Sequence, residues 1–235
     1  MAEKNAKISV TKNGPYLVSG NVPLAKEMIV ADDKGIPIKW EKGKTFPGQK
    51  DYSLCRCGQS RNKPFCDGTH ASTDFNGTET AGHKSFLEQN DPTIGPDLIL
   101  NDAEEFCAIA RFCHRAGDAW NLTENSDDPA KQKIAIQEAC DCPSGRLVVC
   151  DKKTGKPIEP GFEPSISVVE DTAQMISGPL WVKGGIPVGS SDSFQYEIRN
   201  RVTLCRCGGS KNKPFCDGSH CNIKFNDGDE SLGRK

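Results

Sequence analysis

The sequence predicts a β-rich α+β protein in which two similar segments flank a smaller α+β insert. A segment rich in cysteine and histidine occurs twice, at residues 55–70 and 205–220. Short apolar stretches separated by Gly and Pro precede each copy, which is typical of β-strands. The residues between the two copies instead carry helix start signals. We therefore expect segments at 8–75, 91–165 and 166–228.

Composition narrows the function classes. The chain has 235 residues and a formal net charge of -2, so it lacks polyelectrolyte character and we expect no nucleic-acid partner. No apolar run approaches the ~18 residues of a membrane span, and the N-terminus has no apolar export signal. We therefore expect a cytoplasmic protein without a membrane partner, whose 12 cysteines are reduced and available as metal ligands.

The first segment is expected to form short strands at 8–10, 16–18, 22–24, 28–30 and 36–38. Part of this pattern returns before the second cysteine motif, because residues 14–24 align with residues 178–188. The repeat is therefore longer than the cysteine motif, and its two copies run from about 13 to 70 and from about 177 to 220.

Each copy of the motif supplies three thiols and one imidazole, from Cys55, Cys57, Cys66 and His70 and from Cys205, Cys207, Cys216 and His220. Two cysteines one residue apart lie on the same side of an extended chain, and a cysteine and a histidine four apart lie on one face of a helical turn. Two such close pairs fit two adjacent irons better than one zinc ion. A Cys3His zinc site is the alternative.

At these residues the sequence resembles the CDGSH iron-sulfur family, whose motif C-x-C-x2-(S/T)-x3-P-x-C-D-G-(S/A/T)-H is met at every defined position in both copies. The resemblance implies a 2Fe-2S cluster in each repeat. One iron would be bound by Cys55 and Cys57 and the other by Cys66 and His70, with the same division in the second copy.

Members of this family of the mitoNEET type are homodimers in which two chains combine their strands into a shared β-cap. Two copies in one chain resemble that dimer made covalent. The resemblance therefore implies an intramolecular pseudo-dimer with a shared β-cap, and a chain that is monomeric in solution.

The insert is expected to begin with a strand at 97–100. A helix over 103–113, capped by Asn101 or Asp102, should follow. Pro129 marks the first turn of a second helix over 130–139, and strands are expected at 146–149 and 166–169.

The insert has a cysteine pattern of its own, which resembles that of monocluster ferredoxins. Cys107 and Cys113 stand at the first and third places of a C-x2-C-x2-C triplet, Ala110 replaces the second, and Cys142 precedes a proline as the fourth. Three thiolates are the set expected for a 3Fe-4S cluster, whereas a 4Fe-4S cluster needs water, Cys140 or another donor. The alternative is a ferredoxin-like scaffold whose cysteines are buried apolar residues.

No nucleophile–base pair or nucleotide-binding loop is recognisable outside the cysteines, so we do not expect an enzyme. The predicted function is electron transfer, or transfer of an iron-sulfur cluster, with a redox partner or an apo acceptor protein as the second component. The alternative is an interaction module that senses redox state or pH through its clusters. Cys140, Cys150 and Cys221 have no ligand pattern and are expected to be ordinary thiols.

Overall fold

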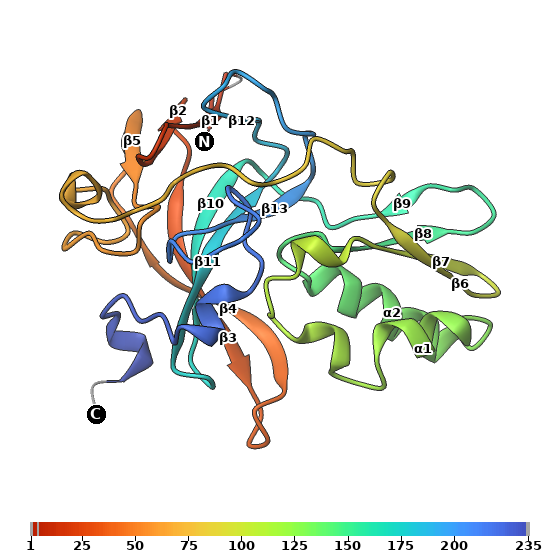
Figure 1. Ribbon diagram of the computed structural model, residues 1–235. Coiled ribbons are helices and arrows are strands. Elements are labelled where there is room, and N and C mark those ends of the chain that lie inside the picture. Colours follow the sequence, from red (N-terminus) through yellow and green to blue (C-terminus); the bar gives the residue numbers. More distant parts are fainter. Residues whose placement is uncertain (1, 4, 234–235) are drawn as a thin grey trace.

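The computed structural model describes residues 2–3 and 5–233 and contains three β-sheets, shown in Figure 1. The first sheet has the order β12 (Val188–Gly189), β1 (Lys7–Val10), β2 (Tyr16–Ser19), β5 (Asp51–Leu54). The second has the order β13 (Arg201–Leu204), β11 (Ile176–Lys183), β10 (Ser165–Asp171), β3 (Leu24–Ala31), β4 (Pro37–Thr45). The third, in the insert, has the order β6 (Asp91–Ile94), β7 (Leu98–Asp102), β8 (Leu147–Asp151), β9 (Pro157–Ile158).

The first two sheets, which we call the cap, each combine strands of both repeats: the first sheet contains β12 of the second repeat, and the second sheet contains β3 and β4 of the first repeat. Strand β12 pairs in parallel with β1, with Ile8 opposite Val188. Strand β3 pairs in parallel with β10, with Ile166 opposite Leu24. Leu24 and Val188 are equivalent in the sequence repeat, so both sheets are built by the same exchange. Because backbone hydrogen bonds join neighbouring strands, each repeat completes the sheet of the other.

One hydrophobic core fills the cap. In β1 and β2 the side chains alternate between buried and more exposed positions, so that Ile8, Val10, Tyr16 and Val18 point inward. The same cluster contains buried residues of the second repeat, including Ile166, Val168, Leu180 and Val182. Each fully buried aliphatic side chain contributes about 1.5–3 kcal/mol. The two repeats are therefore stabilised together rather than as separate domains.

The insert forms its own layer of helices and sheet, on the right of Figure 1. Helices α1 (Ala119–Glu124) and α2 (Pro129–Asp141) pack against β7 and β8 through a core that includes Leu98, Leu100 and Val149. Helix α2 begins as expected, because the Asp128 carboxylate accepts the Ala130 N–H at 2.8 Å.

The helix expected over 103–113 is wrong. The structure has only 3-10 turns at Glu104–Phe106 and Phe112–His114. Ile109 and Arg111 between them have φ values of 52° and 65°. A right-handed helix cannot continue through left-handed residues, so this segment is a loop, although its composition suits a helix.

Several element boundaries also differ from the expected ones. The stretches 22–24 and 28–30 were expected to be separate strands, but the chain from Leu24 to Ala31 is the single strand β3. Strands β6 and β9 and helix α1 were not expected. The α1 start does carry a cap signal, since the Asp118 carboxylate accepts the Trp120 N–H at 3.1 Å.

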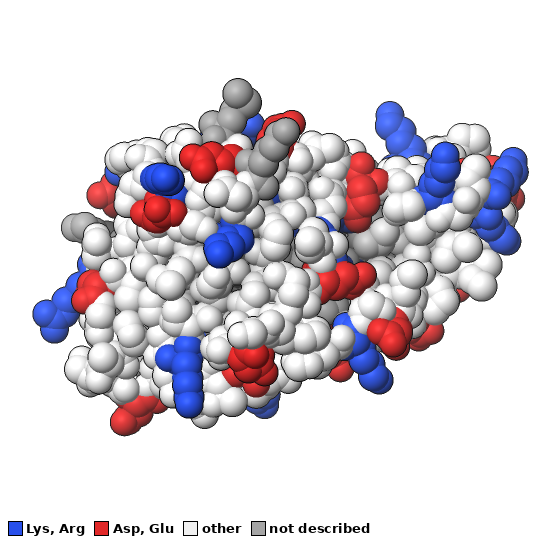
Figure 2. Space-filling view, turned by 90° about the horizontal axis from the view of Figure 1, so that it is seen from above, with Lys and Arg blue, Asp and Glu red and all other residues white. Residues whose placement is uncertain are grey.

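Among the described residues, no helix has both the length and the apolar character required to cross a membrane. On the face shown in Figure 2, Lys and Arg lie interspersed with Asp and Glu, and no single sign of charge dominates. This distribution agrees with the small formal net charge of -2.

Candidate metal centres

Each cysteine motif is a loop that leaves the last strand of its repeat and is held closed by backbone hydrogen bonds. In the first motif the Cys55 N–H donates to the Pro64 carbonyl at 2.8 Å, and the Cys66 N–H donates to the Ser53 carbonyl at 2.9 Å. In the second motif the Cys205 N–H donates to the Pro214 carbonyl and the Cys216 N–H donates to the Thr203 carbonyl, both at 2.9 Å. The two halves of each ligand set therefore lie side by side, although eight residues separate them in the chain.

The paired cysteines at the start of each motif are spaced as ligands of one metal atom. The Sγ atoms of Cys55 and Cys57 lie 3.6 Å apart, and those of Cys205 and Cys207 lie 3.7 Å apart. Two ligands of a tetrahedral metal with metal–sulfur bonds of about 2.3 Å lie about 3.8 Å apart. Each pair of thiols therefore fits a single tetrahedral metal.

The cysteine and histidine at the end of each motif form a second close pair. Cys66 Sγ lies 3.3 Å from His70 Nδ1, and Cys216 Sγ lies 3.4 Å from His220 Nδ1. The donor set at each site is thus three sulfurs and one nitrogen, arranged as two pairs. Soft thiolate with imidazole suits iron-sulfur clusters and zinc.

An aspartate and a glycine shape the turn that carries each histidine. The Asp67 carboxylate accepts the Arg61 N–H at 2.8 Å and the Thr69 N–H at 3.0 Å, and these bonds lower the pKa of Asp67. Asp217 makes the equivalent bonds to Lys211 and Ser219 at 2.7 and 2.9 Å. Gly68 and Gly218 follow with φ values of 86° and 82°, which a residue with a side chain adopts only with strain.

The two motifs contact each other at their first cysteine pairs. A Cβ on Gly58 would lie 2.6 Å from the Cys207 carbonyl oxygen, and a Cβ on Gly208 would lie 2.7 Å from the Cys57 carbonyl oxygen. Glycine is therefore required at both positions for this approach. The Tyr16 hydroxyl also donates to the Cys205 carbonyl at 2.7 Å, which ties the second motif to the first repeat.

The two sites differ in solvent exposure at their histidine ends. Cys66 and His70 are partly exposed, whereas Cys216 and His220 are 2% and 5% exposed. Burial lowers the pKa of His220 to about 4, which keeps the imidazole in the neutral form that binds metals. At the first cysteine pairs the difference is smaller and reversed, since Cys57 is buried and Cys207 is partly exposed.

The insert covers the second motif. The rings of Phe106 and Phe215 meet edge to face with centroids 5.2 Å apart. The Asn212 side chain donates to the Glu105 carbonyl at 2.9 Å. The equivalent Phe65 of the first motif instead packs edge to face on Phe46 and Tyr52 of its own repeat. The insert therefore adds cover at the second motif, which agrees with the lower exposure of Cys216 and His220.

The third group of candidate ligands lies inside the insert. Cys107, Cys113 and Cys142 line one small cavity, and Ala110 lines it at the position where a ferredoxin has its second cysteine. Burial, together with the neighbouring thiols of Cys142 and Cys107, raises the pKa of Cys113 to about 12. Cys140 does not line this cavity, and its thiol instead faces the Ile158 carbonyl at 3.6 Å.

One charged residue at this cavity was missed in the sequence. Arg146 lines it and forms a bidentate ion pair with Asp102, with N–O distances of 2.6 and 2.7 Å. The Asp102 hydrogen bonds and the nearby Cys107 thiol both raise the pKa of Arg146. Asp102 compensates the charge of Arg146 and fixes its guanidinium at the cavity, where its N–H groups can donate to an anionic metal cluster. Its position four residues after Cys142 was the available sequence signal.

Comparison with known protein families divides the chain in the same way. The family described as iron-binding zinc finger CDGSH type matches residues 13–71 and 177–221. The family described as divergent 4Fe-4S mono-cluster matches residues 94–152. No curated protein and no solved structure matches the chain. The matched regions contain the two repeated ligand sets and the three cysteines of the insert, respectively.

Proposed function

Since the chain belongs to the CDGSH-type iron-binding proteins, with two such domains around a divergent 4Fe-4S domain, we propose that it binds a 2Fe-2S cluster in each repeat and carries electrons or transfers clusters. The observation that carries this proposal is the division of each donor set into two close pairs. A pair of thiols 3.6 Å apart and a thiol–imidazole pair 3.3 Å apart provide ligands for two irons.

The residues around each set hold the ligands and limit their motion. The Gly68 and Gly218 N–H groups donate to the sulfurs of Cys66 and Cys216, both at 3.4 Å. Such bonds stabilise the thiolate over the thiol, and thiolate is the metal-binding form. A 2Fe-2S cluster supplies one-electron redox chemistry, and neutral imidazole in place of one thiolate makes the site one charge less negative.

We propose that the insert holds a third cluster on Cys107, Cys113 and Cys142. Three thiols around one cavity, with the guanidinium of Arg146 beside them, support a 3Fe-4S cluster or a 4Fe-4S cluster whose last iron binds another donor. Cys140 is an unsuitable donor because it lies outside the cavity.

We also propose that the chain is a monomer that corresponds to a covalent dimer of single-motif proteins. The exchange of β3 and β12 between the repeats supports this, because the hydrogen-bonding edge of each repeat is already used within the chain. Light scattering over a range of concentrations tests it, and a stable dimer would oppose it.

Iron, acid-labile sulfide and zinc in protein prepared without oxygen test the cluster assignment. We expect iron and sulfide in equal amounts from the repeats, and stoichiometric zinc without sulfide would overturn the proposal. Mixing with an apo ferredoxin then separates the two roles. A carrier of clusters loses its colour to the acceptor, whereas a carrier of electrons keeps it. We propose a carrier and not an enzyme.

A further inference from the structure

The sequence repeat continues beyond the two histidines. Phe75, Asn76 and Gly77 follow the first motif at the spacing with which Phe225, Asn226 and Asp227 follow the second. Each phenylalanine ring packs against the arginine between the two cysteines of its own motif. Arg56 lies 5.4 Å from the ring centre of Phe75, and Arg206 lies 5.3 Å from that of Phe225. The two arginines therefore occupy equivalent environments. These environments differ at one position, which is the uncharged Gly77 in the first repeat and the carboxylate Asp227 in the second.

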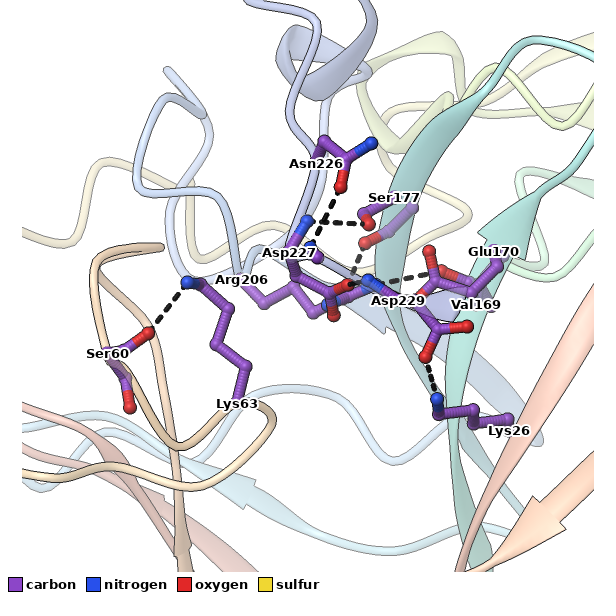
Figure 3. Close-up of polar contacts among 12 residues, drawn as sticks. Lys26, Ser60, Lys63, Val169, Glu170, Ser177, Arg206, Asn226, Asp227 and Asp229 are labelled. Carbon is purple, nitrogen blue, oxygen red and sulfur yellow. Dashed lines mark hydrogen bonds and ion pairs between the residues drawn. The ribbon is translucent and has the colours of Figure 1, made fainter. Parts of the chain in front are cut away.

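Arg206 is neutralised by carboxylates, as Figure 3 shows. Its guanidinium is 3% exposed, forms an ion pair of 2.7 Å with Glu170, and forms a second ion pair with Asp227. Its Nε also donates to the Gly178 carbonyl at 2.7 Å. Because two carboxylates surround it, the positive charge of Arg206 is compensated within the protein.

Arg56 is buried without a carboxylate. It is 1% exposed, and its Nη2 donates to the Gly77 carbonyl. Its Nε and Nη1 have no hydrogen-bond partner among the described residues, and no described carboxylate forms an ion pair with it. Gly77 stands at the position that Asp227 occupies in the second repeat, so the first repeat lacks that carboxylate.

A buried guanidinium without a counter-charge is costly, so the fold needs an anion near Arg56. Arg56 stands between Cys55 and Cys57, and a 2Fe-2S site with three thiolates carries a negative charge that one-electron reduction increases. The Arg56 side chain points away from the two cysteines beside it, but its guanidinium lies near the histidine end of the same ligand set. A Cβ on Gly77 would meet both Arg56 Nη2 and the Asn13 backbone, and a Cβ on the adjacent Gly14 would lie 3.6 Å from His70 Nε2. The first ligand set is therefore the anion available to Arg56. At the second site Glu170 and Asp227 already supply that charge.

We propose that Arg56 makes the first site the more easily reduced of the two, because its uncompensated charge stabilises the added electron. This inference rests on the proposed function. In the step concerned, one electron leaves a one-electron donor, a reduced iron-sulfur or flavin protein, and one ferric ion at the first site becomes ferrous. In the reverse step, the ferrous ion returns this electron to the acceptor protein of the proposed function, which is the oxidant. One electron enters and one electron leaves the site. Arg56 binds no metal and acts only by placing a positive charge near the first site.

The test is a reductive titration of the whole protein with dithionite, followed by EPR of the reduced 2Fe-2S sites. We expect the two 2Fe-2S sites to be reduced in two separate one-electron steps, which their EPR signals distinguish from reduction of a cluster in the insert. The variant Arg56→Met should shift the more positive step to lower potential, with a change on the order of tenfold in the ratio of reduced to oxidised site, which is about 59 mV for one electron. Arg56→Lys keeps the charge and should retain most of the native potential.

The second site provides an independent variant. Asp227→Asn removes a carboxylate with little change in shape, and should shift the more negative step to higher potential. If Arg56→Met lowers iron content and cannot be titrated, Asp227→Asn alone decides. Coincident native steps, or a titratable Arg56→Met or Asp227→Asn protein with native potentials, would overturn this inference. Protein without iron or a reduced 2Fe-2S signal would instead overturn the proposed function.

Discussion

Ile109 of the insert fills the space that a side chain on Gly218 of the second motif would occupy, and the Cys107 carbonyl oxygen lies 3.4 Å from the same point. At the equivalent Gly68 of the first motif, a Cβ would meet nothing within 4 Å. The loop that carries two candidate ligands of the insert therefore covers one CDGSH-type site and leaves the other open.

This contact predicts that the two repeats release iron at different rates. A chelator should empty the first site several-fold faster than the second, because Cys66 and His70 are partly exposed whereas Cys216 and His220 are buried. Iron loss can be counted by native mass spectrometry, and alkylation of the freed thiols identifies the emptied site. In Ile109→Ala the second site should open and the two rates should converge, while Leu87→Ala, at a side chain 68% exposed, should change neither.

Two matched glycine variants test the packing of the insert. Both Gly68→Ala and Gly218→Ala place a side chain at a positive φ, at a cost of about 1–2 kcal/mol. Only Gly218→Ala also displaces Ile109, which should add about 1–3 kcal/mol. Thermal unfolding should show the larger loss for Gly218→Ala, with faster hydrogen exchange over residues 104–113. Equal losses would mean that the insert is not held by this contact.

The ligand exchange His70→Cys should make the first site harder to reduce. A thiolate in place of neutral imidazole adds one negative charge, so the potential of that site should fall and that of the second should stay. EPR-monitored titration checks this, with His220→Cys as the reciprocal variant. A shift of both potentials by His70→Cys would contradict independent ligand sets.

The double variant Cys107→Ala with Cys142→Ala tests the third cluster. The repeats should account for about four irons per chain, and a 3Fe-4S or a 4Fe-4S cluster would raise the total to about seven or about eight. We expect the double variant to lose that excess and to keep the iron of the repeats. An oxidised 3Fe-4S cluster gives an EPR signal that a 4Fe-4S cluster at its usual +2 level lacks. Native protein with about four irons would leave the insert as a scaffold.

Glu138 in α2 makes stability depend on pH. It is fully buried, and burial raises its pKa, although the hydrogen bond from the Ala116 N–H opposes this. The folded state then holds the proton more tightly than the unfolded state, so the contribution to stability falls as pH rises from ~4.3 through the folded pKa. Glu138→Gln keeps the acceptor oxygen without the charge.

At neutral pH Glu138→Gln should therefore be more stable than the parent, and the difference should vanish below pH ~4. Urea unfolding at several pH values measures this. Glu124→Gln, at an exposed position of α1, is the control and should show no such trend. A variant less stable than the parent at pH 7 would contradict the assignment.

Sequence-based expectations were most accurate where few residues along the chain decide the structure. The signal of Asp128 and Pro129 predicted the start of α2, and the alternation of residues 8–18 predicted β1 and β2. They were wrong over 103–113, where the composition favours a helix. The left-handed conformations of Ile109 and Arg111 belong to a loop packed on the second motif, and local propensity cannot report such a contact.

The sequence by itself determined which side chains gather at each repeat, because the four candidate ligands and the hydrogen bonds that close their loop lie within residues 53–70 or 203–220. Only the tertiary structure decided how the two repeats differ. The exchange of β3 and β12, the cover that Ile109 gives to Gly218, and the carboxylates that neutralise Arg206 join residues that are distant in the chain. Such contacts depend on how whole sheets pack, so they cannot be predicted from two motifs whose sequences are nearly identical.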